Sequence, residues 1–231
     1  MSPTKHIAAS LAALVALMVF FELTNFDLWV QDFLYTPQSE EWLLSTSNSP
    51  LYFIFYDGPK KLLVFFELAL LFVAIFFNQR VLFKHYQQGI LIVLIALPLG
   101  PALVSSLKSS TNVACPYALV DYGGKLPYIG VLESYPEDSQ PQKRQRCFPA
   151  GHASGGFALL ALYYLPKSRG NKNKMLALAM TAGTLMGGYK MMVGHHFLSH
   201  TLVSMLICWL VVNIVALLVL PWRSMNSSVL D

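Results

Sequence analysis

The residues with the clearest potential for chemistry are two lysines and four histidines in the second half of the chain: Lys108, His152, Lys190, His195, His196 and His200. Ammonium groups bind anions, and an imidazole serves as a nucleophile or as a general acid or base near neutral pH. His196 and His200 are four residues apart, so they share one helix face if a helix begins by Phe197. Gly151, beside His152, would let an anion approach the backbone N–H groups at a helix N-terminus. This set predicts an anion-binding site equipped for histidine chemistry.

The composition states what kind of structure must position these residues. Hydrophobic residues make up 55% of the 231 residues and charged residues only 12%, whereas a soluble domain carries about 25% charge. Mean hydropathy is +0.51. These values exclude a disordered chain, a coiled coil and an ordinary cytosolic enzyme. The hydrophobic composition predicts an integral membrane protein in contact with the bilayer. The net charge of +4 gives no indication of a nucleic-acid partner.

Six apolar stretches approach the roughly 20 residues that a helix needs to cross a bilayer. They span residues 7–23, 62–77, 89–107, 149–165, 175–193 and 201–220. We therefore expect a single all-α domain of six transmembrane helices over residues 1–231. Lys5 precedes the first stretch as in a signal peptide, but no small-x-small cleavage site follows it, so we expect this helix to be retained.

The charges in the connecting segments predict the orientation of these helices. The N-terminus, residues 78–88, residues 166–174 and the C-terminal tail hold eight cations and one acid, Asp231. The cations are Lys5, Arg80, Lys84, Lys167, Arg169, Lys172, Lys174 and Arg223. The positive-inside rule then places both termini in the cytoplasm and the long loops 24–61 and 108–148 outside.

This topology brings the chemical residues to one membrane face. The third span ends outward at Lys108, the fourth begins near His152, the fifth ends near Lys190, and the sixth begins around the remaining histidines. The stretch 149–165 would be about 25 Å long at 1.5 Å per residue, shorter than the roughly 30 Å hydrocarbon core. Its start would therefore lie at the depth of the lipid headgroups, where phosphates are abundant.

The order and spacing of these residues resemble the three-part signature of the PAP2 (type 2 phosphatidic acid phosphatase) superfamily. That signature is Lys-x6-Arg-Pro, then Pro-Ser-Gly-His, then Ser-Arg-x5-His-x3-Asp. The chain has Lys108-SSTNVA-Cys115-Pro116, then Pro149-Ala150-Gly151-His152, then Lys190-MMVGH-His196-FLS-His200. Cysteine, alanine, lysine and histidine replace the arginine of the first part, the serine of the second, and the arginine and aspartate of the third.

The resemblance implies a PAP2-like bundle and a phosphatase that needs no cofactor and no metal. His196 would attack phosphorus and form a phosphohistidine, His152 would protonate the leaving group, and His200 would orient His196. Lys108, Lys190 and the backbone at Ala150 and Gly151 would hold the phosphate oxygens. His195 would lie at the membrane interface.

The implied substrate is a lipid phosphomonoester or diphosphate. The predicted topology places the site on the outer face of the membrane, and the small size and simple organisation of the chain lead us to expect a bacterial inner membrane. Phosphatidic acid, phosphatidylglycerophosphate, undecaprenyl diphosphate and lipid A are candidates that the sequence does not separate. Arg144 or Arg146 is a candidate for the missing guanidinium, and Asp121 for the missing carboxylate. The sequence does not indicate an oligomeric state.

Three other functions fit parts of the pattern. A metal-dependent hydrolase would use His152, His195, His196 and His200 as ligands, since an i, i+4 pair is a common ligand spacing. A phosphotransferase would pass the phosphoryl group to another lipid. An inactive binder or transporter would explain the changed motif residues, although a transporter would place polar groups near the membrane centre.

The cysteines give one structural expectation. Cys115 and Cys147 both lie in the predicted outer loop, and Cys208 lies in the sixth span. Because outer compartments are oxidising, we expect a Cys115–Cys147 disulfide. The bridge would tie the end of the Lys108 motif to the start of the His152 motif.

Overall fold

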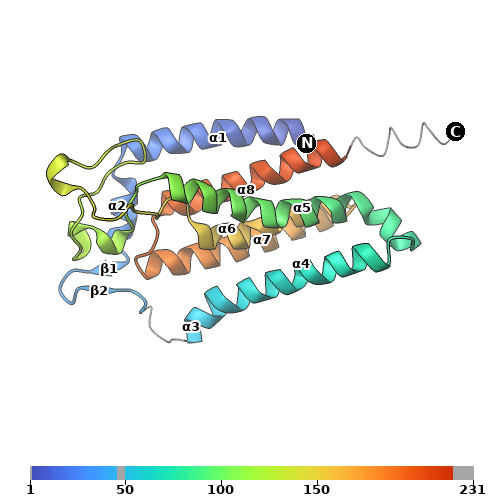
Figure 1. Cartoon of the computed structure of the whole chain (residues 1–231), viewed down its shortest axis with the longest axis horizontal. Coiled ribbons are helices and arrows are strands. Elements are labelled where there is room, and N and C mark those ends of the chain that lie inside the picture. Colours follow the sequence, from blue (N-terminus) through green and yellow to red (C-terminus); the bar gives the residue numbers. More distant parts are fainter. Residues whose placement is uncertain (1, 46–49, 221–231) are drawn as a thin grey trace.

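The computed structural model of the chain describes residues 2–45 and 50–220. Six long helical segments lie side by side along the molecule (Figure 1). They are α1 (Pro3–Leu23), α4 (Gly58–Phe76), α5 (Val81–Ser110), α6 (Gly151–Ala158) continued by the 3₁₀-helix η5 (Leu159–Tyr164), α7 (Arg169–Met192) and α8 (Leu198–Val219). A helical segment therefore overlaps most of each of the six predicted ranges, which confirms the all-α class.

Three of these helices, α1, α5 and α8, are long and apolar enough to cross a membrane. Among the described residues, the other three helices are too polar or too short to meet the same requirement of length and hydropathy. Helix α4 contains Lys60, Lys61 and Glu67, α7 contains four basic residues, and α6 has only eight residues before η5 begins. Membrane association through three helices is thus supported, whereas the six spans and the side of the termini stay predictions. Arg223 and Asp231, which contributed to the predicted orientation, lie outside the described residues.

The two long connecting segments lie at one end of the helices, and the start of α1 and the end of α8 lie at the other (Figure 1). The first segment contains α2 (Phe26–Asp32) and a hairpin of β1 (Tyr35–Thr36) with β2 (Glu41–Trp42), in which Tyr35 faces Trp42. Next come α3 (Pro50–Tyr52) and the π-helix η1 (Phe53–Asp57). Helix α4 begins at Gly58, so the predicted loop 24–61 is shorter than expected at its end. The second segment contains three single-turn 3₁₀-helices, η2 (Pro116–Ala118), η3 (Val120–Tyr122) and η4 (Glu137–Ser139).

Helix α8 is the centre of the bundle and contacts α1, α5 and α6. It is apolar on all sides, which is typical of a helix surrounded by others. Helices α6 and α7 pack closely where two glycines meet. A Cβ placed on Gly156 would lie 2.6 Å from the Cα of Gly183. Small residues at such crossings let helix backbones approach, as is common in membrane bundles.

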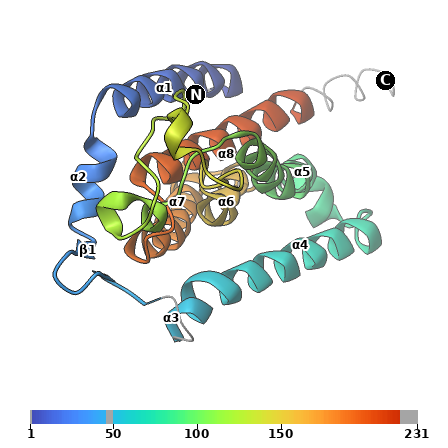
Figure 2. The same cartoon turned by 60° about the vertical axis from the view of Figure 1, so that its left-hand side comes forward.

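Helix α4 stands apart from the rest of the bundle (Figure 2). It packs mainly on α5, and a cavity of about 410 Å³ separates it from α5 and α6. Pro98 and Pro101 line this cavity, and α5 continues through both prolines. The cavity runs along the helices beside His152 and Gly151 at the start of α6.

The α6–α7 contact gives a direct test of the packing. We expect Gly156→Ala to lower the melting temperature of the detergent-solubilised protein, because the new methyl group would collide with the α7 backbone. Gly188→Ala is the matched control, since a Cβ there meets nothing within 4 Å. Alanine favours a helix by about 1 kcal/mol over glycine, so the control should melt at the same temperature or higher. Equal stability of the two variants would contradict this packing.

Candidate active site

The turn between α7 and α8 carries two of the candidate histidines. Gly194 has φ = +73° in this turn, a conformation that favours glycine. A Cβ on Gly194 would lie 2.3 Å from Trp42 of the hairpin, so the turn is also closely covered. The backbone N–H of His195 donates to the carbonyl of Lys190 at 2.8 Å. These constraints direct His196 inward, where it is only 2% exposed.

Segments distant in the sequence hold this turn from outside through hydrogen bonds to its backbone. The bonds run from Gln31 Nε2 to Met191 O at 3.0 Å, from Leu44 N–H to Met192 O at 3.1 Å and from Tyr117 N–H to Gly194 O at 3.0 Å. Gln31 is fully buried, so its amide belongs to the packed structure. The outer segments therefore fix the position of the histidine turn.

Three histidine rings come together at this point. The ring centroids of His196 and His200 are 5.7 Å apart, and those of His152 and His196 are 5.9 Å apart. His196 precedes α8, because Phe197 is the N-cap residue. The two residues therefore do not share a helix face as expected. His196 belongs to the turn before α8, and its ring lies beside that of His200 in the first turn of α8.

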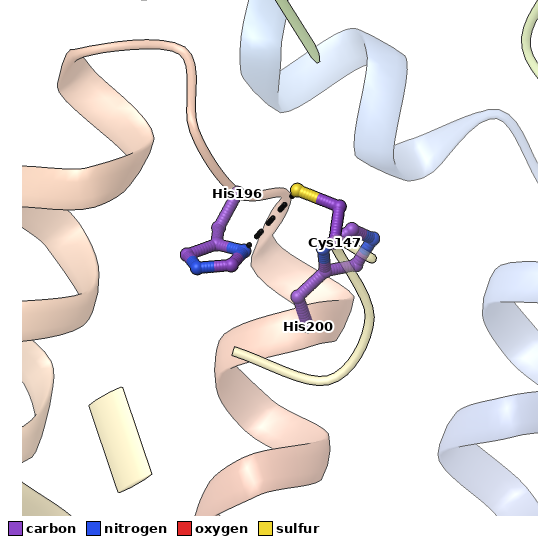
Figure 3. Close-up of side chains that lie close together, drawn as sticks. All are labelled: Cys147, His196 and His200. Atoms are coloured by element: carbon purple, nitrogen blue, oxygen red, sulfur yellow. Dashed lines mark hydrogen bonds between the residues drawn. The ribbon is translucent and has the colours of Figure 1, made fainter. Parts of the chain in front are cut away.

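A disulfide joins Cys115 and Cys147, whose Cα atoms are 5.1 Å apart. The sulfur of Cys147 lies 3.5 Å from Nδ1 of His196 (Figure 3). A disulfide sulfur carries no hydrogen, so it can only accept, and Nδ1–H of His196 must be the donor. This contact leaves the lone pair on Nε2, which points away from the sulfur in Figure 3. Burial, with His200 and Lys108 nearby, holds the pKa of His196 well below its usual range, so the ring is neutral at neutral pH.

The same three side chains raise the question of a metal. Ligand atoms of Cys147, His196 and His200 lie within 4.8 Å of one another. Once the disulfide has formed, the sulfur cannot bind a metal as a thiolate, and two imidazoles remain in this group. Structural zinc sites have four protein ligands and catalytic ones three, so the oxidised protein provides an incomplete set here.

Lysine side chains supply the positive charge of the site. Lys190, in the last turn of α7, is 4% exposed, and its Nζ lies 4.7 Å from the ring centroid of Tyr56 and 5.6 Å from those of Tyr52 and Tyr189. Such cation–π contacts offset part of the cost of removing an ammonium group from water. Neither Lys190 nor the half-buried Lys108 forms a salt bridge with any residue in the described ranges.

The tyrosines that surround Lys190 were missed in the sequence. The ring of Tyr56 also lies 4.5 Å from that of His152, so one side chain contacts a lysine and a histidine of the site. Tyr56 belongs to the π-helix η1, and π-helical turns often occur at functional sites. Its position in an outer segment with a weak pattern gave no signal beforehand.

The start of α6 differs from the expectation in one respect. The Ala150 N–H donates to the carbonyl of His200 at 3.1 Å, so it is not free to bind an anion. The N–H groups of Gly151 and His152, at the first two helical positions, have no partner among the described residues. A Cβ on Gly151 would meet nothing within 4 Å, which shows open space at the positive end of the helix.

The other candidates lie around this centre. His195 is partly exposed, packs its ring 5.5 Å from that of Tyr117, and has its pKa lowered to about 4 by burial and by Lys190 and Lys108. Arg144 donates to backbone carbonyls at the end of α5, whereas Arg146 lines an open depression together with Lys108. Asp121 is exposed on η3, so it does not join the buried histidines.

Comparison with known proteins gives one match. The family model described as the PAP2 superfamily matches residues 89–224, more than half of the chain, and this range includes Lys108, His152, Lys190 and His196. No curated protein and no solved structure matches the chain.

The disulfide allows a stability test. It closes a loop across 32 residues, and the chain-entropy model assigns about 3–4 kcal/mol to such a bridge. We expect the C115S/C147S variant, and the wild type under dithiothreitol, to melt at a lower temperature than the oxidised wild type. Dithiothreitol should not change the double variant. Equal melting temperatures for the oxidised wild type, the reduced wild type and the double variant would contradict a stabilising bridge.

Proposed function

The chain belongs to the PAP2 superfamily, whose members are phosphatases that act on phosphate esters, and we propose that it is a membrane lipid phosphatase that works through a phosphohistidine. The observation that carries this proposal is that the His152 ring lies beside the His196 ring and shares the ring of Tyr56 with Lys190, next to an apolar cavity that His152 lines. The reaction centre would lie near the outer surface of a bacterial inner membrane, at the end of a six-span bundle where the connecting segments gather.

The two rings provide a nucleophile and an acid for one phosphoryl group. Nε2 of His196 would attack phosphorus while the bond from phosphorus to the leaving oxygen breaks, and His152 in its protonated, imidazolium form would give that oxygen a proton. Water activated by His152 would then attack phosphorus and release phosphate from His196. The neutral state of His196 supports the first step, because a nucleophile needs its lone pair.

The cations would hold the oxygens on which charge accumulates in the transition state. Lys190 and Lys108 have no competing salt bridge among the described residues, so an anion can use both charges. The free N–H groups of Gly151 and His152 would add donors at the positive end of α6. No carboxylate contacts the two lysines in the described part of the chain, which favours a substrate with a doubly charged phosphate.

The cavity between α4, α5 and α6 supports a lipid substrate. It has a volume of about 410 Å³, begins at His152 and Gly151, and is lined by Leu63, Leu97 and Met186 among other apolar residues. A phosphate at His152 would place the attached hydrocarbon chain in this cavity. The polar groups of the site come from the end of α5, the start of α6, the end of α7 and the start of α8. This arrangement suits an enzyme at the membrane surface better than a transporter with polar groups at the membrane centre.

Phosphate release from lipids tests the proposal. We expect purified wild type in detergent to release phosphate from at least one of phosphatidic acid, phosphatidylglycerophosphate, undecaprenyl diphosphate and lipid A, and to do so in EDTA. His196→Ala should lower kcat more than about a thousandfold, because a lost nucleophile is rarely replaced. His85→Ala, at an exposed histidine of α5, is the control and should keep wild-type activity.

Each other outcome of this assay has a definite meaning. Activity lost in EDTA would favour a metal-dependent hydrolase over the phosphohistidine reaction. Loss of phosphate from the lipid without free phosphate would indicate transfer to another lipid. No reaction with any of the four lipids would contradict the proposed function.

The cavity gives a second test. We expect Leu63→Trp to fill part of the cavity and raise KM for long-chain lipid phosphates about tenfold, equivalent to about 1.4 kcal/mol of binding. Hydrolysis of a small soluble phosphate ester such as p-nitrophenyl phosphate should be unchanged. The control Leu62→Trp alters the neighbouring residue, which is 67% exposed and does not line the cavity. Equal effects of the two variants on the lipid would exclude this cavity as the binding site for the chain.

A further inference from the structure

His200 occupies the motif position that holds aspartate in the superfamily signature, and its surroundings are incomplete. The side chain is 2% exposed, and its ring lies 5.2 Å from the ring of Phe148. Its Nδ1 is buried and has no hydrogen-bond partner among the described residues. A buried polar atom without a partner costs about 1–3 kcal/mol of stability, so a hydrogen bond to this nitrogen would stabilise the folded protein.

A carboxylate from the first outer segment lies near His200. Asp27 of α2 is 3% exposed, and its Oδ1 accepts the N–H of Ser199, the residue before His200, at 2.9 Å. A carboxylate offers about four lone-pair positions, so the bonds from Ser199 leave other positions free. Burial raises the pKa of Asp27 to about 6, against the opposing effect of the hydrogen bonds from Ser199 and Leu198.

Asp27 and His200 line the same small cavity of about 20 Å³. A site of at least about 10–15 Å³ can hold one water if polar groups surround it. Tyr128 and Glu22 also line the cavity, but both carboxylate oxygens of Glu22 accept backbone N–H groups of the outer loop. Glu22 is thus held by the outer loop, whereas Asp27 is bonded to the residue next to His200 and is the better placed of the two carboxylates.

We propose that Asp27 is a positioning residue of the phosphatase site, which acts on His200 through one water molecule in this cavity and so replaces the aspartate of the signature. The inference rests on the proposed function. The water donates one hydrogen to Nδ1 of His200 and the other to a carboxylate oxygen of Asp27. This fixes the tautomer and the ring plane of His200, and it places a negative charge behind the His196–His200 pair.

The charge is needed when the phosphohistidine forms. Nε2 of His196 gives its electron pair to phosphorus, the P–O bond to the leaving group breaks with its own pair, and the leaving oxygen takes a proton from His152. The His196 ring keeps its Nδ1–H and becomes cationic. A neutral His200 alone provides no negative charge to oppose this cation, whereas ionised Asp27 provides one from the far side of His200.

The test variant is Asp27→Asn, because asparagine keeps an oxygen that accepts the Ser199 N–H and removes the charge. We expect kcat on the lipid substrate to fall about 10–100-fold, with KM nearly unchanged. Loss of a residue that orients a metal-binding histidine through a hydrogen bond has an effect of this size. Asp32→Asn is the matched control, since it makes the same change on α2 at an exposed carboxylate that accepts a bond from Tyr122. It should keep wild-type kcat.

Rescue separates this role from a purely structural one. His200→Asp restores the carboxylate of the signature directly, so the D27N/H200D variant should recover most of the activity that D27N loses. A D27N protein with wild-type kcat, or a double variant as slow as D27N, would overturn the proposal. If the wild type releases no phosphate, the proposed function has failed. If the wild type is active and D27N has the same kcat, only the role of Asp27 is contradicted.

The pH dependence provides a readout that packing would not change. The groups that face Asp27 are Glu22 from α1, Tyr128 from the outer loop and His200 from α8. As the pH falls through about 6, Asp27 becomes protonated and its charge is lost. The ratio of wild-type to D27N kcat should therefore fall toward one, and titration of the substrate cancels in this ratio. A ratio that is constant between pH 5 and 8 would contradict the proposal.

Discussion

Burial of a cationic, imidazole-rich cluster without an acidic contact is the constraint on which the rest of the structure depends. Lys190 and His196 are both almost fully buried, yet no salt bridge in the described ranges reaches either side chain. Removing such groups from water is costly unless they gain partners. Tyrosine rings surround the ammonium group, and desolvation keeps the imidazole neutral. An anionic phosphate would complete the balance of charge.

The outer segments make this arrangement possible, because they fix a turn that apolar helices alone could not hold. Gln31 and Trp42 contact the turn between α7 and α8 from segments more than 140 residues away in sequence. The disulfide then brings the Cys147 sulfur to Nδ1 of His196. Cys115 stands where the superfamily signature has arginine, so the residue that removes a guanidinium also provides half of the bridge beside the proposed nucleophile.

The sequence was sufficient for the parts of the structure that depend on length, periodicity and order. The helical segments and the convergence of Lys108, His152, Lys190 and the later histidines at one end of the bundle follow from apolar runs and alternating direction. The positions of Asp27 beside His200 and of Tyr56 beside Lys190 could not be foreseen, because both residues lie in a segment without regular periodicity and reach these neighbours through tertiary packing. The donor at Ala150 was also beyond prediction, since its use by His200 depends on how α6 approaches α8.

The central claim is that His196 becomes phosphorylated, and trapping of the intermediate tests it most directly. Wild-type protein would be mixed rapidly with the lipid phosphate that it hydrolyses, quenched in alkali and analysed by peptide mass spectrometry. Phosphohistidine survives alkali and is lost in acid, so the account predicts an acid-labile phosphoryl group on His196 that is absent from His196→Ala. Active wild-type turnover with no phosphoryl group on His196, or with one on another residue, would contradict the account.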